Sequence, residues 1–286
     1  MSYNTKNKTC FSVVTLNCKG INDVTKFQKI INIFKAYHAD IICLQETNLK
    51  ISHNNYIIKN WQHFKIFNYY TAILINNSKI IIKKTSTLFN GCSLKIDFEF
   101  NNIDFRLYNI YSPPDRQSRI KFWNSFYPIQ KSNATNIILG DLNCILYPDR
   151  DRISTSNYQK DPTVKLILEK LKNYTDTYSI FNPTPQFTFE MQSHQHKSKL
   201  DYIFTDNTST FDFNSKTLYA FSDHLTLHVD FIHKIASKSN TIWKLNTRLL
   251  KDPKINERIN NTNLNQFENW DELKFFLRNI LITSKL

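Results

Sequence analysis

Residues 15–26 read T-L-N-C-K-G-I-N-D-V-T-K, and residues 39–49 read A-D-I-I-C-L-Q-E-T-N-L. A short apolar run typical of a buried strand comes before the polar residues in both places: V-V-T-L before Asn17 and I-I-C-L before Gln45 and Glu46. Between them, the apolar residues of 23–37 repeat at helical spacing. The order strand, helix, strand predicts one half of an α/β fold with polar groups at the strand ends.

The same change from apolar to polar residues recurs further along the chain. It reaches Tyr111 in N-I-Y-S-P and Asp141 in G-D-L-N, while K-L-D-Y-I-F and F-S-D-H supply further acidic and His residues. One such dipeptide alone would ordinarily be a helix cap or a solvated turn, but packing gives no reason for a whole series of apolar runs to end this way. Carboxylates, amides and a histidine so placed can converge on one cation and one phosphate. The set comprises Asn17, Glu46, Tyr111, Asp141, Asn143, Asp201, Asp223 and His224.

The rest of the pattern predicts a second β/α half. Short strands are expected at 63–67, 71–76, 79–86, 92–99 and 103–110, where they would form an antiparallel meander. Helices are expected at 117–130 and 162–173, and further strands at 136–140, 186–190, 200–204, 215–220 and 225–231. Two β/α halves imply two sheets packed face to face, with the helices outside.

The formal charge of +13, from 37 basic and 24 acidic residues, suits a polyanionic partner, either nucleic acid or an anionic membrane. No apolar run approaches the ~18 residues of a membrane span, so the charge points to nucleic acid before lipid. Only eight of the basic residues are Arg and only three residues are Gly. An A/T-rich genome would also encode this composition. Part of the positive charge would then result from codon bias and would lie on a solvated surface.

The five cysteines are odd in number and form no C-x-x-C pair. Cys43 and Cys144 lie in apolar contexts, where reduced, buried thiols are the expected state. With no secretory signal, this pattern predicts an intracellular, reducing compartment. Zinc catalysis is not expected, because no His/Cys cluster has zinc spacing.

These motifs resemble the endonuclease/exonuclease/phosphatase superfamily over residues 11–232. Within it, the chain is most similar to the endonuclease domain of LINE-type, non-LTR retrotransposons. The closer resemblance rests on residues 15–49, on N-I-Y-S-P-P-D-R-Q-S-R-I-K-F-W at 109–123 and on G-D-L-N-C-I-L-Y-P-D-R-D-R at 140–152. It implies a DNase I-like fold, a four-layer α/β sandwich of two packed mixed β-sheets flanked by helices, with the site at one rim.

The resemblance also implies a metal site. Glu46, Asn17 and Asp223 would hold Mg²⁺ or its waters, with Mn²⁺ as a possible substitute. A hard cation that keeps several waters suits one or two protein carboxylates.

The remaining members of the series receive catalytic roles from the same resemblance. Asp141 would deprotonate the attacking water, and Asn143 would fix that water or the phosphate. Asp201 would set the tautomer of His224, which would donate to the phosphate. Tyr111 would offer its hydroxyl to a phosphate oxygen, although a tyrosine in this context, taken alone, is more often a strand aromatic.

DNA contacts are expected beside the catalytic series. Residues 190–198 predict a polar hairpin, which in LINE endonucleases lies on the DNA next to the scissile bond. A polar hairpin tip that is merely solvated is the alternative. The residues with expected DNA contacts are Arg152, Thr188, His194, Gln195, His196, Lys197 and Ser198.

Three segments are expected. Residues 1–10 would be disordered, 11–232 would form the endonuclease domain, and 233–286 would be a linker, with Pro253 as a breaker, followed by a helical extension. The extension resembles the segment that precedes the reverse transcriptase in LINE reading frames, so that polymerase of the same polyprotein is an expected partner. A plain C-terminal helix docked on the core is the alternative.

The function implied is a Mg²⁺-dependent nick in one strand of duplex DNA. Its 3′-hydroxyl would prime target-primed reverse transcription in the nucleus. An apurinic/apyrimidinic repair endonuclease is the main alternative, and it would prefer abasic DNA. A targeting module that binds DNA without cutting is the second, but it would have no need for Glu46, Asp141 and His224 together.

Overall fold

The computed structural model describes residues 10–50, 61–127, 133–154, 161–179, 187–190, 196–208, 210–234 and 253–262. The chain divides into two compact units, residues 1–235 and residues 236–286. In the second unit, helix α6 (Pro253–Asn260) is described. Pro253 therefore begins a helix and does not break one, because the first turn of a helix leaves its N–H groups unbonded in any case. The predicted linker begins at residue 233, but His233 is still the last residue of β15. Residues 235–252 of that linker and the helical pattern from Phe267 onward lie outside the described residues.

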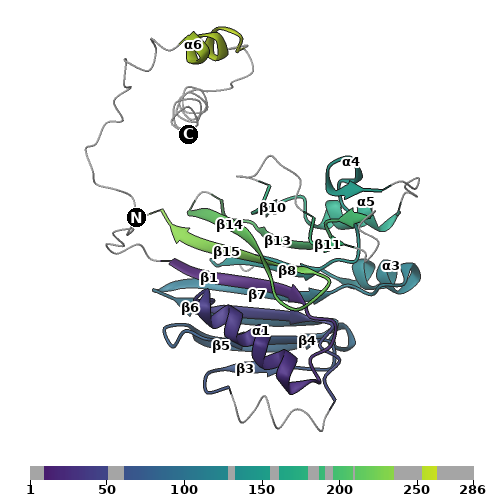
Figure 1. Ribbon diagram of the computed structural model, residues 1–286. Coiled ribbons are helices and arrows are strands. Elements are labelled where there is room, and N and C mark those ends of the chain that lie inside the picture. Colours follow the sequence, from purple (N-terminus) through teal and green to yellow (C-terminus); the bar gives the residue numbers. More distant parts are fainter. Residues whose placement is uncertain are drawn as a thin grey trace. The chain divides into compact units, whose positions relative to one another are not determined.

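The first unit contains two six-stranded sheets (Figure 1). The first sheet has the order β14 (Phe211–Tyr219), β15 (Leu225–His233), β1 (Cys10–Asn17), β2 (Ile41–Gln45), β4 (Thr71–Ile75), β3 (Lys65–Phe67). The second has the order β10 (Thr175–Asp176), β13 (Asp201–Thr205), β8 (Thr135–Asp141), β7 (Ile103–Tyr111), β6 (Ser93–Phe100), β5 (Ile81–Leu88).

Each sheet has one parallel pair at its centre, and the other pairs are antiparallel. β1 runs parallel to β2 in the first sheet, and β7 runs parallel to β8 in the second. A parallel pair needs a crossover, which α1 (Val24–Ala36) and α3 (Arg116–Ser125) supply. Parallel neighbours end at the same edge of a sheet. The carboxyl ends of β1 and β2 therefore lie together in the first sheet, and those of β7 and β8 lie together in the second.

The predicted meander is wrong in its pairing. β3 and β4 belong to the first sheet, whereas β5, β6 and β7 form a meander in the second. β4 is buried along its whole length and pairs with β2, while β5 is largely exposed and lies at an edge. Apolar periodicity predicts that a strand exists but does not identify its partner.

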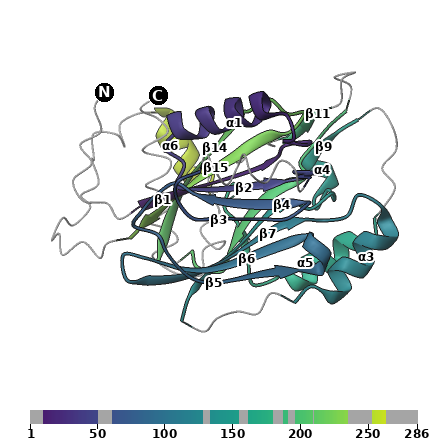
Figure 2. The same ribbon diagram turned by 90° about the horizontal axis from the view of Figure 1, so that it is seen from below.

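Four layers result, which confirms the predicted sandwich. Apolar side chains of both sheets fill the space between them. Phe27, Ile30 and Phe34 of α1 cover the outer face of the first sheet, and α3 and α5 (Thr163–Lys170) cover the outer face of the second. Figure 2 shows α1 on one side of the stacked sheets and α3 and α5 on the other. Among the helices described, none combines the length and apolar character that a membrane span requires.

A small third sheet lies beside the second. The predicted hairpin is present at its base, where β11 (Phe189–Glu190) pairs with β12 (Lys197–Ser198). β12 also pairs with β9 (Arg152–Ile153), which follows the short helix α4 (Pro148–Asp151). The prediction lacked β9, because two residues are too few to show an alternating pattern.

Candidate active site

The central strands of both sheets end at one rim. Asn17 is the last residue of β1 and Asp141 is the last residue of β8. The Asn17 side-chain nitrogen donates to Oδ2 of Asp141 at 2.8 Å and to Oε2 of Glu46, which directly follows β2, at 3.1 Å. One amide therefore joins two carboxylates that the two sheets contribute separately.

A second, fully buried amide pair holds the two sheets together just inside this rim. Gln45 Nε2 donates to Oδ1 of Asn109 at 2.6 Å. Asn109 Nδ2 in turn donates to the carbonyl oxygens of Leu44 and Ala72 in the first sheet. No role was predicted for Gln45 or Asn109. Their signal is a polar side chain within an otherwise apolar strand, which requires a buried partner.

The backbone next to Asp141 depends on a close approach. Gly140 has a φ of 129°, and a Cβ there would lie 2.0 Å from the carbonyl oxygen of Ile110 on β7. Asn143, with a φ of 46°, donates its backbone N–H to Oδ1 of Asp141 at 2.7 Å. Its side-chain amide donates to the Ser112 carbonyl oxygen at 2.8 Å. These contacts hold both Asp141 oxygens in defined directions.

His224 and Asp201 form a buried pair beside Asp141. Nδ1 of His224 lies 2.8 Å from Oδ2 of Asp201, and Asp201 is directly opposite Asp141 in the antiparallel β13–β8 ladder. The Phe189 ring packs on the imidazole with 5.0 Å between centroids. The sequence analysis predicted this His–Asp contact, which leaves Nε2 as the remaining ring nitrogen.

The shared burial of these groups shifts their pKa values. Burial raises the pKa of Asp141, the Asp201 charge adds to the rise and His224 opposes it, which brings the value to about 7. Burial alone would lower the pKa of His224, but the charge and hydrogen bond of Asp201 raise it to about 9. Burial, together with Glu46 and Asp141, raises the pKa of Tyr111 well above its usual range. His224 and Tyr111 are therefore both protonated at neutral pH and can donate hydrogen bonds.

The rim offers oxygen donors that fit a hard divalent cation. Glu46 and Asp223 are only partly buried, unlike Asp141. Lys19 Nζ lies 2.6 Å from Oδ2 of Asp223, so a cationic group already occupies one side of this carboxylate. Cys18 adds no soft ligand, because burial raises the pKa of its thiol to about 12. This donor set fits Mg²⁺ or Mn²⁺.

A second group of possible ligands lies deeper. Asp141, Asp201 and His224 each place one ligand-type atom within 4.8 Å of the others. Two of these residues already bond each other, and the raised pKa of His224 disfavours the neutral imidazole that a metal would need. The chemistry of the inner group therefore suits proton transfer, and that of the outer oxygens suits a cation.

The model of the endonuclease/exonuclease/phosphatase family matches residues 1–224. The chain belongs to this family. Family members are metal-dependent phosphodiesterases and nucleases.

Solved structures share the fold at low sequence identity. An apurinic endonuclease from Leishmania major is 16% identical with a TM-score of 0.61, covering 79% of this chain and 88% of that one. TDP2 from D. rerio, complexed with a single-strand DNA product, is 15% identical with a TM-score of 0.58, covering 78% and 99%. The endonuclease domain of TRAS1, a telomere-specific non-LTR retrotransposon, is 13% identical with a TM-score of 0.54, covering 79% and 99%. At these identities the likeness supports the fold alone.

The expected DNA-contact residues of this family member are only partly brought together. Arg152 and Ser198 face each other in the β9–β12 register, and both line a cavity of about 270 Å³. His196 also lines it, and its Nδ1 lies 2.5 Å from Ser154 Oγ. Lys197 is ion-paired with Glu190 at 3.0 Å, which reduces its value as a phosphate ligand. His194 and Gln195 lie outside the described residues.

Thr188 was expected to contact DNA, but the structure gives it a different place. Its side chain is fully buried, and its hydroxyl accepts hydrogen bonds from the backbone N–H groups of Leu200 and Asp201 at 3.0 and 3.1 Å. Its carbonyl oxygen accepts from Leu225 N at 2.7 Å. Thr188 therefore positions the strands that carry Asp201 and His224.

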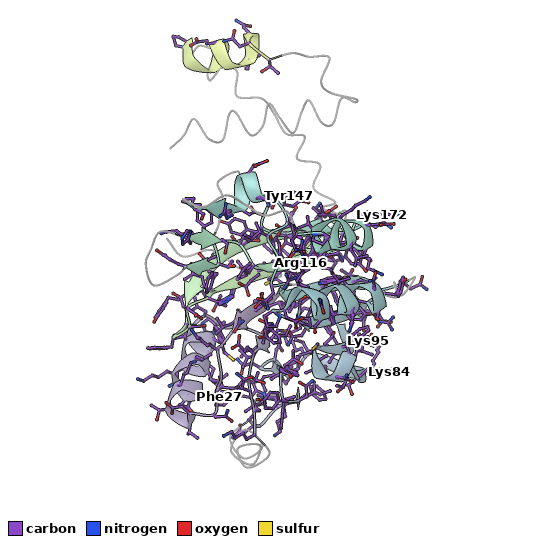
Figure 3. All side chains as sticks on the ribbon, turned by 90° about the vertical axis from the view of Figure 1, so that its right-hand side faces the viewer. Phe27, Lys84, Lys95, Arg116, Tyr147 and Lys172 are labelled. Atoms are coloured by element: carbon purple, nitrogen blue, oxygen red, sulfur yellow. The ribbon has the colours of Figure 1, made fainter. Side chains whose placement is uncertain are left out.

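Basic side chains are spread over more than one region of this family member. Lys84 and Lys95 lie on neighbouring strands, β5 and β6, whereas Arg116 begins α3 and Lys172 follows α5 (Figure 3). The net positive charge therefore does not by itself locate a DNA-binding face.

Proposed function

We propose that this protein is a divalent-metal-dependent DNA endonuclease that nicks one strand and leaves a 3′-hydroxyl. One observation carries the proposal: at a single rim, the carboxylate Asp141 lies beside the buried His224–Asp201 pair and is linked through Asn17 to the cation-type oxygens of Glu46. This combination provides a base, an acid and a cation site for one phosphodiester.

Asp141 accepts a proton from the attacking water, because its pKa of about 7 suits a base that works near neutral pH. The water oxygen bonds to phosphorus and the bond to the 3′ oxygen breaks. That oxygen takes a proton from solvent water and leaves as the 3′-hydroxyl. The other product carries the 5′-phosphate. Asn143 orients the Asp141 carboxylate through its backbone N–H.

The hydrogen-bond donors around the phosphate stabilise the charge of the transition state. Protonated His224, held by Asp201, and the protonated Tyr111 hydroxyl stabilise the charge that builds on the phosphate oxygens. Glu46, Asn17 and Asp223 would hold Mg²⁺ or Mn²⁺, which neutralises phosphate charge when bound.

The role in a non-LTR retrotransposon is also part of the proposal. Residues 15–49, 109–123 and 140–152 support it, and so does the shared fold of the TRAS1 endonuclease domain. In this role the nick primes reverse transcription by a polymerase of the same polyprotein, at chromosomal DNA in the nucleus. The structure of TDP2 with a single-strand DNA product supports DNA as the polymer recognised.

Cleavage of two matched duplexes tests the proposal. One is intact and the other carries a single abasic site, and each is incubated with Mg²⁺ or with EDTA. We expect metal-dependent nicking of the intact duplex, with ends that a DNA polymerase extends. Cleavage confined to the abasic site would replace this function with DNA repair. Binding without cleavage in either duplex would leave a targeting module.

A further inference from the structure

Phe221 has an unfavourable backbone conformation next to the site. It lies two residues before Asp223 with a φ of 52°, in the left-handed region that bulky side chains rarely adopt. The residue is nevertheless 41% exposed, so core packing alone does not account for it. Strained backbone conformations cluster at active sites and ligand-binding segments, which makes Phe221 a candidate for contact with a ligand.

Two neighbours extend this surface. Tyr219 is 63% exposed, and its ring centroid lies 5.8 Å from that of Phe221. Lys29, on the exposed side of α1, places Nζ 5.4 Å from the Phe221 centroid. Ala220, between the two rings, is fully buried in the cluster under α1 and anchors the segment. We call Tyr219 and Phe221 the aromatic platform.

Lysines connect the aromatic platform to the rim. Lys26 lies one helical turn before Lys29, so both are on the same side of α1. Its Nζ is bonded to the carbonyl oxygens of Cys18 and Lys19, at 2.6 and 3.1 Å. The Lys19 ammonium pairs with Asp223. A row of positive groups therefore leads from the platform to the proposed cation site.

We infer that the aromatic platform stacks an unpaired base of the DNA strand, while Lys29, whose ammonium lies over the Phe221 ring, contacts a phosphate of that strand. Bases stack on exposed aromatic rings without regard to sequence, and lysines that follow the backbone add affinity that salt weakens. The two described carboxylates closest along the chain do not oppose this, because Asp223 is paired with Lys19 and Asp23 caps α1. The inference rests on the proposed function and adds that the enzyme engages unpaired DNA next to the nick.

Binding in EDTA tests the platform separately from catalysis. The probes are a fluorescently labelled single-stranded oligonucleotide and the blunt, fully paired duplex of the same sequence, measured by anisotropy. Phe221→Gly should lower affinity for the single strand roughly 5- to 100-fold, the range of one lost stacking contact. Affinity for the duplex should change less. Glycine suits the left-handed conformation, so the backbone of this segment should be retained in the variant.

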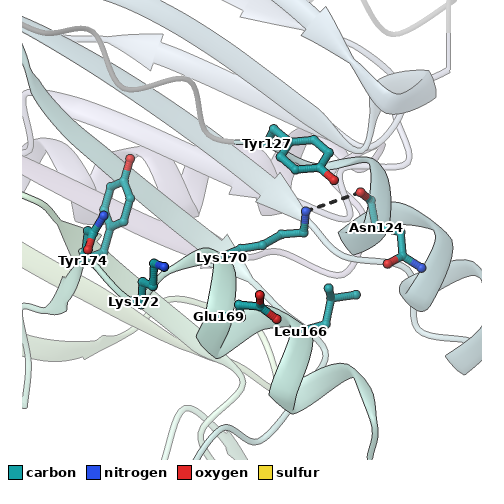
Figure 4. Close-up of a pocket in the computed structure, with 8 residues that line it drawn as sticks. Asn124, Tyr127, Leu166, Glu169, Lys170, Lys172 and Tyr174 are labelled. Carbon is teal, nitrogen blue, oxygen red and sulfur yellow. Dashed lines mark hydrogen bonds between the residues drawn. The ribbon is translucent and has the colours of Figure 1, made fainter.

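Tyr127→Ala is the matched control. Tyr127 is 70% exposed, and Lys170 Nζ lies 3.5 Å from its ring centroid, so this pair has the same chemistry as the platform. It follows the last turn of α3 beside a cavity whose lining also includes Asn124 (Figure 4). Affinity for either probe should be unchanged in this variant.

A fluorescent adenine analogue in the single strand reports stacking directly. Its emission should be quenched by the parent and by Phe221→Tyr, and not by Phe221→Gly. Equal single-strand affinity and equal quenching in the parent and Phe221→Gly would overturn the inference; if that variant does not fold, Tyr219→Ala is read by the same criteria. Should the parent bind through the platform but cut no DNA, the proposed function would fail while the platform stands.

Discussion

Replacing Asp201 by Asn separates charge from position at the centre of the site. Asp201 holds His224 Nδ1 at 2.8 Å and contributes most of the rise in the pKa of His224. The variant keeps the shape of the side chain and removes its charge. The effect of burial and the opposing charges of Asp141 and Asp223 would remain, so we take the ordinary value of 6.5 as the endpoint. The His224 pKa should then fall from about 9 by about 2.5.

This change predicts a specific dependence on pH. At pH 8 the protonated fraction of His224 should fall from about 0.9 to about 0.03, which is roughly a 30-fold loss of the active form. At pH 6 it should remain above about 0.7. The limb of the pH–rate profile on the acid side reports the ionisation of Asp141. It should also move to lower pH, because the Asp201 charge raises the pKa of Asp141 in the parent. The whole bell-shaped profile therefore shifts to lower pH.

The assay is single-turnover nicking of an end-labelled duplex by the parent and Asp201→Asn, from pH 5.5 to 9.5, at saturating Mg²⁺. A loss of position alone would lower both limbs by the same factor. If the ratio of parent to variant rates were the same at pH 6 and pH 8, His224 would not act as the charged donor.

Further substitutions test other parts of the site and its support. Asp141→Asn should reduce nicking by roughly 10²- to 10⁴-fold. The same variant should have a higher Tm at pH 8. The pKa of Asp141 is raised on folding, so its charged form destabilises the folded protein at pH values above the pKa of the unfolded state, and Asn removes that charge. The gain in Tm should vanish in scans near pH 4. Gly140→Ala should lower stability in urea by more than about 3 kcal/mol, because its Cβ would meet the Ile110 carbonyl oxygen; a normal midpoint would contradict the close approach. Lys199→Met should cost about 3–5 kcal/mol by leaving Asp176 buried without its partner, and adding Asp176→Leu should recover most of that loss in the same assay.

The main strands and helices could be predicted because their signals are local. Residues 23–37 repeat apolar groups at helical spacing, and Asp23 caps the helix that forms. The apolar run before Asn17 forms a strand that is almost entirely buried. Pairing was harder, since the 63–110 strands divide between two sheets and nothing in their alternation marks the division.

The site was predictable as a set of residues but not as a geometry. The order of Asn17, Glu46 and Asp141 along the chain says nothing of the single amide that joins them across both sheets. Thr188 was expected to face DNA, yet its side chain is buried and bonds the backbone of Leu200 and Asp201. Burial of a polar residue depends on partners that are distant in sequence, so no local pattern reveals it.

Nicking of supercoiled plasmid tests the central claim most directly. The parent and His224→Ala are incubated with Mg²⁺ or EDTA, and the nick positions are mapped by primer extension. The site described here predicts metal-dependent conversion to the nicked circle by the parent, at clustered positions in intact duplex, and a rate at least about 10²-fold lower for His224→Ala. Equal nicking by His224→Ala, or nicking that persists in EDTA, would contradict it.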